Sequence, residues 1–111
     1  MTLFERIAAG EIPARIVWKD DRVFAFHDIQ PIAPIHVLIV PFRPIVALSA
    51  AALQDRELLG HLLWAAGEVA KVLGAERGFR LVINDGEEGG QSVPHLHVHL
   101  LAGRKLDWPP G

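Results

Sequence analysis

The spacing of hydrophobic residues predicts two helices. Apolar residues recur at helical intervals after Thr2, a residue that can cap a helix, and Glu5 stands at the capping-box position. A short helix over residues 3–9 is therefore expected. Apolar residues recur at steps of three or four from residue 53 to residue 73, which is typical of an amphipathic helix, and Gly74 is a natural end for it.

Shorter runs of alternating or continuous apolar residues predict strands. They cover residues 14–19, 22–27, 35–40, 79–84 and 94–101. The order of helix, three strands, helix and two strands favours an α+β fold with a five-stranded antiparallel sheet. The Asp20-Asp21 pair between the first two strands predicts a hairpin turn. Because an open sheet has edges, a small domain of this kind often dimerises.

The composition narrows the class of protein. The chain has 111 residues, which fits one domain over 1–111, and half of them are hydrophobic. The net charge of −2 argues against a nucleic-acid polymer as partner. The absence of cysteine excludes disulfides and thiolate-bound zinc. No leader-like segment or long apolar run is present, so we expect a cytoplasmic protein with no membrane partner.

Three alternating histidines are the strongest candidates for chemistry. A strand over residues 94–101 would place His95, His97 and His99 on one face, with apolar residues on the other. Such a row has two possible uses. It could bind a metal ion, since alternate histidines on a strand are zinc ligands. It could instead serve phosphoryl chemistry, in which one neutral imidazole attacks phosphorus while its neighbours bind oxygens or relay protons.

A glycine-containing loop lies just upstream of the histidines, over residues 85–92. Gly89 and Gly90 would let backbone N–H groups approach an anion closely, and Ser92 adds a hydroxyl donor. A phosphate group suits this loop better than a zinc ion does. Taken alone, the glycine pair is more simply an ordinary turn, and it gains weight only beside the histidine row.

At these residues the chain resembles the histidine triad (HIT) superfamily, and within it the histidine triad nucleotide-binding branch, the purine nucleoside phosphoramidases. The similarity extends over nearly the whole chain, in several motifs that occur in the same order. The motifs are Gly89-Gly90-Gln91-Ser92-Val93-Pro94-His95-Leu96-His97-Val98-His99-Leu100-Leu101, Ile12-Pro13-Ala14, Phe26-His27-Asp28-Ile29, Pro34-Ile35-His36, Leu59-Gly60-His61-Leu62 and Trp108-Pro109-Pro110-Gly111.

The resemblance implies a role for each candidate residue. His97 would be the nucleophile that forms a nucleotidyl-histidine intermediate, flanked by His95 and His99, with His36 behind His99 in a relay. The phosphate and leaving group would be held by Asn84, Gly90, Gln91, Ser92 and the Val93 backbone. Asp28 would bind the ribose hydroxyls. The base would be walled by Leu3, Phe4, Ile7, Ile12, Phe26, His27 and Ile29, and Trp108 would approach the active site of a partner subunit.

The function implied by the resemblance is hydrolysis of purine nucleoside 5′-phosphoramidates and related AMP or GMP adducts, releasing a nucleoside monophosphate and an amine. The enzyme would be a homodimer, with the long helix and a central strand at the interface, and would use neither metal nor other cofactor. Three alternatives stay open: a dinucleoside polyphosphate hydrolase, a nucleotide-binding regulatory or scaffold protein with incidental activity, and a metalloenzyme built on the histidine row.

Three departures from the family pattern are noted. Pro94 precedes the histidine row where many relatives have an aromatic residue, and Ala102 replaces a glycine after the row. Phe42-Arg43-Pro44 stands where relatives often carry lysines or histidine, near the expected leaving-group side. None of these departures touches the nucleophile. His61, within the long helix, is interpreted as a surface or interface histidine.

Overall fold

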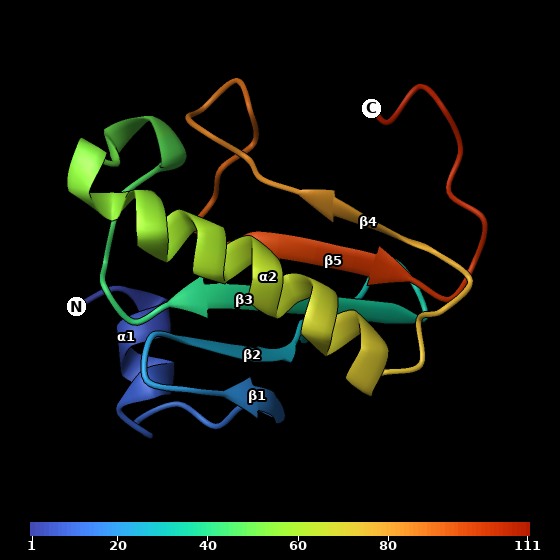
Figure 1. The fold of residues 1–111 in the computed structure, drawn as a ribbon, viewed down its shortest axis with the longest axis horizontal. Coiled ribbons are helices and arrows are strands. Elements are labelled where there is room, and N and C mark those ends of the chain that lie inside the picture. The colour runs from blue at the N-terminus through green and yellow to red at the C-terminus, as the bar shows by residue number, and fades with distance from the viewer.

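One five-stranded antiparallel sheet organises the protein, as seen in a computed structural model that describes residues 1–111 (Figure 1). Its strands run in the order β1-β2-β3-β5-β4. The bounds are β1 (Ile16–Lys19), β2 (Val23–His27), β3 (Ile35–Pro41), β4 (Phe79–Val82) and β5 (Val98–Ala102). The helices are α1 (Leu3–Ala8), α2 (Arg56–Val72) and the short 3-10 turns η1 (Leu48–Ala50) and η2 (Leu53–Asp55). The predicted fold class is confirmed.

The long helix α2 lies across one face of the sheet (Figure 1). Its buried side recurs at three- and four-residue steps, through Leu58, Leu62, Ala66 and Val69. These side chains belong to a core cluster of 16 buried hydrophobic residues that includes alternate positions of the strands beneath. The predicted helix began at residue 53, but residues 53–55 form the 3-10 turn η2 instead. No helix combines the length and the hydrophobicity needed to cross a bilayer.

The short helix α1 begins as the sequence predicts. The Thr2 hydroxyl accepts a hydrogen bond from the Glu5 N–H, and the Glu5 carboxylate accepts one from the Thr2 N–H, which completes a capping box. The helix packs through Phe4, which is buried with Phe24 and Phe26 in a second, smaller cluster. Because Phe24 and Phe26 alternate with the α2-facing residues of β2, α1 covers the opposite face of the sheet.

The hairpin between β1 and β2 turns at Asp20, as predicted. One carboxylate oxygen of Asp20 accepts hydrogen bonds from the backbone N–H groups of Arg22 and Val23. The other lies 2.8 Å from Nε2 of His61 on α2 and 3.0 Å from Nε1 of Trp18. The hairpin is therefore tied to the long helix, and His61 is held by a structural contact.

The last strand corrects the sequence prediction. A strand over residues 94–101 was expected to carry all three histidines on one face, but β5 begins only at Val98. Pro94 has no N–H to give to a ladder, and the His95 N–H bonds back to the Val93 carbonyl oxygen at 2.8 Å. This tight bend precedes the strand. Of the three histidines, only His99 lies in β5, so the three rings have different surroundings.

Candidate active site

The site residues come together on the sheet face opposite α2. His36 is the second residue of β3 and pairs with Leu101, while His99 on β5 pairs with Leu38. In both strands the polar side chains thus alternate with residues of the α2-facing core, which fixes them on the other face. His97 lies in the segment that enters β5. The ring centroids of His97 and His99 are 5.0 Å apart, and those of His36 and His99 are 5.2 Å apart.

The hydrogen bond of His97 determines which of its ring nitrogens is available for reaction. Nδ1 lies 2.7 Å from the carbonyl oxygen of His95. Since a carbonyl oxygen can only accept, Nδ1 carries the proton, and the neutral ring keeps a lone pair on Nε2. Nε2 has no partner within the chain. The ring is 4% exposed and is held edge-on by Phe4, with 4.9 Å between centroids. The geometry provides a fixed ring with one unpaired, nucleophilic nitrogen.

A chain of two histidines lies beside this ring. The Ile32 N–H donates to Nδ1 of His36 at 3.2 Å, so the neutral His36 ring carries its proton on Nε2. His36 Nε2 lies 2.9 Å from Nδ1 of His99 and donates to it. A neutral His99 must then carry its proton on Nε2, the nitrogen on the far side of the ring. A backbone N–H therefore sets, through two rings, where His99 can donate.

The pKa values of both relay histidines favour the neutral forms. Burial lowers the pKa of His99 to about 4, and the neighbouring His97 and His36 act in the same direction. Burial also lowers the pKa of His36, although the Asp28 carboxylate opposes the shift. At neutral pH these two rings are therefore neutral donors and acceptors, which the assignment of protons above requires.

Asp28 lies at the edge of this relay. One of its oxygens accepts a hydrogen bond from the Gln30 N–H at 2.8 Å, and the other is 3.4 Å from Nε2 of His36. Donor atoms of Asp28, His36 and His99 all lie within 4.8 Å of one another, and their types suit a divalent transition-metal ion. The hydrogen bond from His36 Nε2 to His99 Nδ1 already occupies this position. A metal ion bound there would have to displace the proton of that hydrogen bond.

His95 has a different environment from the other two histidines of the row. It is 0% exposed, its Nε2 donates to the Pro41 carbonyl oxygen at 2.8 Å, and its Nδ1 lies 2.7 Å from the Thr2 hydroxyl. Burial lowers its pKa. Both ring nitrogens are thus hydrogen-bonded within the chain, and neither is free to bind a ligand. The backbone carbonyl oxygen of His95 in turn orients the His97 ring.

The loop before the histidines has a tightly specified backbone. A side chain at Gly89 would collide with the Asp85 carbonyl oxygen, and Gly90 has a φ of +83°, so both positions favour glycine. The Gln91 amide donates to the carbonyl oxygens of Val46 and Val93 and accepts from the Gly86 N–H. Gln91 is thus engaged in bracing the loop. The exposed Ser92 hydroxyl makes no hydrogen bond within the chain.

The residues expected around a base fall into two groups. Phe4 and Phe26 are buried, with centroids 5.8 Å apart, and lie behind the histidines. The others offer accessible apolar surface and can contact a ligand directly: Leu3, Ile7, Ile12, His27 and Ile29 are half-buried or exposed. Burial and the charge of Arg15 lower the pKa of His27. Asn84 is half-buried beyond the end of β4.

Trp108 is separate from the histidines in this chain. It is 81% exposed, and the Arg80 guanidinium lies 6.0 Å from the centre of its ring. Arg80 also donates to the Asp107 carbonyl oxygen at 2.8 Å, which ties the tail to β4. The structure thus leaves the Trp108 ring free for a contact outside its own chain.

Two contacts of the site escaped sequence reasoning. Thr2 was interpreted only as a helix cap, yet its hydroxyl also meets the buried His95 ring across 93 positions of sequence. The Pro41 carbonyl oxygen fixes the other side of the same ring. No sequence signal marks a backbone carbonyl as a partner, because every residue has one. The capping signature did mark Thr2, but not its second role.

Comparison with known proteins identifies relatives along the whole chain. The sequence profile of the HIT domain family matches residues 9–106. An uncharacterized HIT-like protein from Synechocystis sp. is 56% identical over 110 residues, covering 99% of this chain and 96% of the relative. A HIT family hydrolase from Legionella pneumophila superposes with a TM-score of 0.96 at 46% identity, over 100% of both chains. A histidine triad nucleotide-binding protein from Candida albicans gives a TM-score of 0.83 at 30% identity, over 98% of this chain and 83% of that one.

These similarities extend over the whole domain and include the histidine segment. The fold is that of the HIT family hydrolases. The chain belongs to the HIT family.

Proposed function

We propose that the protein hydrolyses purine nucleoside 5′-phosphoramidates and related nucleotidyl adducts through a covalent intermediate on His97. The observation that carries the proposal is the unpaired Nε2 of a ring whose Nδ1 proton is held by the His95 carbonyl oxygen. Such a nitrogen, in the neutral form of the ring, is a competent nucleophile toward phosphorus. The relay of His36 and His99 stands beside it, with a donor nitrogen available for a phosphoryl oxygen.

In the first step, Nε2 of His97 attacks phosphorus, and the phosphorus–nitrogen bond of the substrate breaks. The departing nitrogen takes up one proton from water and leaves as an amine. The Ser92 hydroxyl, which makes no hydrogen bond within the chain, is the candidate to pass that proton on. The ring now carries a positive charge. Its Nδ1–H remains bonded to the His95 carbonyl oxygen, which stabilises the charged form.

In the second step, water attacks the same phosphorus and the bond to Nε2 breaks. Water gives up one proton, which balances the proton taken by the amine, and the ring returns to its neutral form. The Nε2–H of His99 donates to a phosphoryl oxygen in both steps. Because the pKa of His99 is about 4, it donates as a neutral ring and does not change charge during the cycle.

The surroundings support a purine nucleotide as the bound group. The accessible apolar side chains of Leu3, Ile7 and Ile29 can cover the faces of a base, while buried Phe4 supports them from behind. A surface of this kind offers little hydrogen-bond readout, so adenine and guanine should be accepted alike. Asp28 keeps one carboxylate oxygen free enough to accept from the ribose hydroxyls.

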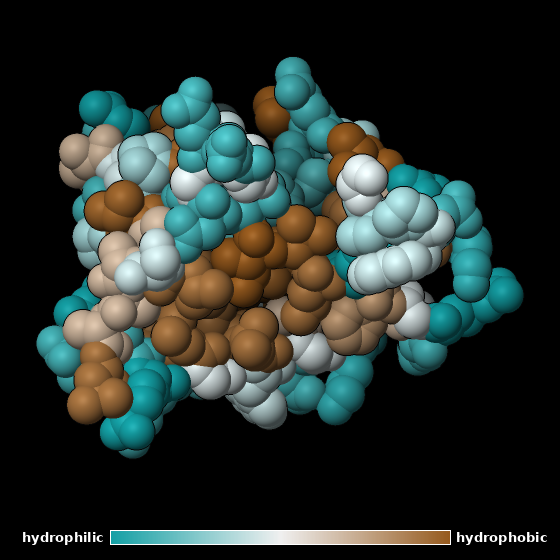
Figure 2. All heavy atoms as spheres, turned by 90° about the horizontal axis from the view of Figure 1, so that it is seen from above, coloured by the Kyte–Doolittle hydropathy of each residue, from teal (hydrophilic) through white to brown (hydrophobic).

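The homodimer is part of this proposal. β4 is the last strand of the sheet, so its outer edge has no strand partner. Leu63 and Val72 on α2 and Phe79 on β4 are large, hydrophobic and between 43% and 61% exposed. Viewed from above, on the β4 side, the molecule shows a continuous hydrophobic area (Figure 2). Pairing of two β4 edges would bury this area and turn β4 into a central strand of a larger sheet.

Mass spectrometry of the protein quenched during turnover of adenosine 5′-phosphoramidate tests the chemistry. We expect an added nucleotidyl mass that maps to the peptide containing His97. A mass on another residue, or turnover with no adduct under conditions that trap a preformed phosphohistidine standard, would contradict the mechanism. Parallel assays with diadenosine polyphosphates would show whether the amine adducts are the preferred substrates.

A further inference from the structure

The edge of β4 is flanked by two projections of opposite charge. The loop that follows β4, residues 84–92, carries Asp85, Glu87 and Glu88 and no basic residue. At the other end of the strand, the tail that follows β5 carries Arg104 and Lys105. Both segments rise above β4 in Figure 1, and in Figure 2 hydrophilic segments stand on both sides of the hydrophobic area.

The acidic loop is ordered but leaves two carboxylates without a partner. The Asp85 carboxylate accepts from the Ser49 N–H at 2.8 Å, and the Gly86 N–H donates to Gln91. Glu87 and Glu88 are exposed and form no ion pair within the chain. The loop backbone thus holds two negative charges at its tip with nothing in the same protomer to neutralise them.

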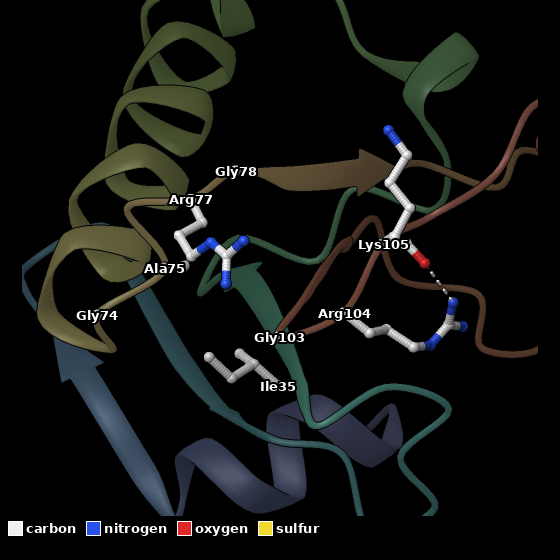
Figure 3. Close-up of a pocket in the computed structure, with 8 residues that line it drawn as sticks. All are labelled: Ile35, Gly74, Ala75, Arg77, Gly78, Gly103, Arg104 and Lys105. Carbon is white, nitrogen blue, oxygen red and sulfur yellow. Dashed lines mark hydrogen bonds between the residues drawn. The ribbon is translucent and has the colours of Figure 1, made fainter.

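The basic end of β4 surrounds a cavity of about 280 Å³ (Figure 3). Its lining includes Arg77, Arg104 and Lys105 and no acidic residue, and none of the predicted nucleotide-pocket residues is among them. Arg104 is held in place by donating to the carbonyl oxygens of Lys105 and Ile32. Arg77 and Lys105 make no ion pair and no side-chain hydrogen bond within the chain.

Two acidic residues and one further basic residue lie near this end of β4. Glu76 is adjacent in sequence, and its carboxylate lies near Gly74 at the rim. Asp107 follows in the tail. Its backbone oxygen accepts a hydrogen bond from the Arg80 guanidinium, so Arg80 brings a further positive charge to this end of the strand. Arg77, Arg80, Arg104 and Lys105 together outnumber the two acids, so the net charge of this end of β4 is positive.

Two-fold symmetry brings these two ends together. If two β4 edges pair antiparallel about an axis perpendicular to the sheet, the end of β4 in one protomer meets the start of β4 in its partner. The acidic loop follows that end, and the basic cavity adjoins that start. We propose that Glu87 and Glu88 of each protomer bind at the Arg77 and Lys105 side chains of its partner, forming two identical acid–base clasps.

This inference rests on the homodimer proposed above and adds the residues that orient it. A parallel pairing would place like charges together, and a shifted antiparallel pairing would move the opposite charges apart, so the clasps favour one register. They also connect to the site. The clasped loop continues into Gly90 and Ser92, so the partner would hold the segment that is proposed to receive the phosphate.

Charge reversal on each side provides the test. One double variant is Glu87→Lys with Glu88→Lys, the loop variant; the other is Arg77→Glu with Lys105→Glu, the tail variant. Each homodimer would then oppose like charges, and we expect the dimer Kd to rise by about tenfold or more at low salt, with a smaller effect at high salt. An equal reversal on the distant strand edge, Lys19→Glu with Arg22→Glu, serves as the matched control and should leave Kd unchanged.

Mixing the two variants gives the sharper result. A mixed dimer pairs each reversed loop with a reversed tail and each native loop with a native tail, so both clasps are restored. Native mass spectrometry should therefore show the mixed dimer in excess over both homodimers, and a chain with all four changes should dimerise like the parent. A parent that dimerises with neither variant affected would refute the clasps alone. A parent that stays monomeric at high protein concentration would refute the homodimer itself.

Discussion

The two faces of the sheet are built differently, and the difference separates stability from chemistry. The face under α2 is covered by a cluster of 16 buried hydrophobic residues. The other face has a cluster of only 5, three of them phenylalanines, and beside it stand His36, His95 and His97, all of them buried. The same strands supply both faces, because alternate side chains point in opposite directions.

This comparison explains how buried imidazoles are tolerated. Each pays a desolvation penalty unless its nitrogens are hydrogen-bonded. His95 bonds at both nitrogens and His36 is bonded by Ile32 and His99, whereas His97 leaves Nε2 without a partner. The large core on the other face supplies most of the buried hydrophobic contacts of the fold, while Nε2 of His97 stays without a partner and open to a ligand.

The largest expected effect is loss of turnover at the histidine face. His97→Ala removes the nucleophile, and we expect the turnover rate to fall by about a thousandfold or more while nucleotide binding persists. Steady-state kinetics and calorimetric titration with AMP measure the two quantities. His61→Ala is the matched control, because that ring contacts Asp20 on the other side of the molecule. Parent-level turnover in His97→Ala would exclude this residue as nucleophile.

The core face should respond in the opposite way. Leu62→Ala leaves a cavity under α2 at a side chain that is 1% exposed. The free energy of unfolding should fall by about 2–5 kcal/mol, while the turnover of the folded fraction at low temperature stays near that of the parent. Urea denaturation and initial rates test this pair of outcomes. A change confined to turnover would show that the two faces are more strongly coupled than their separate packing indicates.

The buried histidines should make the free energy of unfolding depend on pH. The pKa values of His36, His95 and His99 are lowered in the folded protein, so unfolding takes up protons below about pH 6.5. Stability is fully present above that pH and declines as pH falls toward 4, by about 1.4 kcal/mol per pH unit for each proton taken up. Urea midpoints from pH 8 to 4 measure the slope, and His99→Asn should flatten it.

Asp20 on the hairpin titrates in a different window. Its burial would raise the pKa, but hydrogen bonds from the Arg22 and Val23 N–H groups and from Trp18 and His61 outweigh this and lower the pKa to about 2. Its stabilising contribution is present above about pH 4 and is lost as pH falls toward 2. This window lies below that of the histidines. If the unfolding free energy of His99→Asn changes with pH above pH 4 as steeply as that of the parent, His99 does not cause the decline described above.

The smallest effect is expected where α1 meets the histidine face. Thr2→Val keeps the shape of the side chain but removes the hydroxyl that caps α1 and meets Nδ1 of His95. We expect a loss of about 1–2 kcal/mol in unfolding free energy. A Glu5→Gln variant, which alters the capping box but not the His95 contact, is the comparison. If both changes cost the same and neither alters turnover, the contact between Thr2 and His95 has no role in positioning His97.

The sequence by itself determined the fold class and marked the histidine row as the candidate for chemistry. Helical spacing from residue 53 to 73, the capping signature at Thr2 and the turn at Asp20 depend on local geometry, and the structure reproduces them with small shifts at the ends. The burial of Leu96, Val98 and Leu100 could be predicted in the same way. Alternation along the chain separates them from the histidines, and all three side chains belong to the core.

Only the tertiary structure decided what each histidine can do. The sequence pattern made the three histidines equivalent members of one strand face, but the bend at Pro94 and His95 separates them before β5 begins at Val98. The partners that assign each proton are an Ile32 N–H, the His95 and Pro41 carbonyl oxygens and the Thr2 hydroxyl. Backbone groups are the same in every residue, so their partners follow from the path of the folded chain and not from side-chain identity.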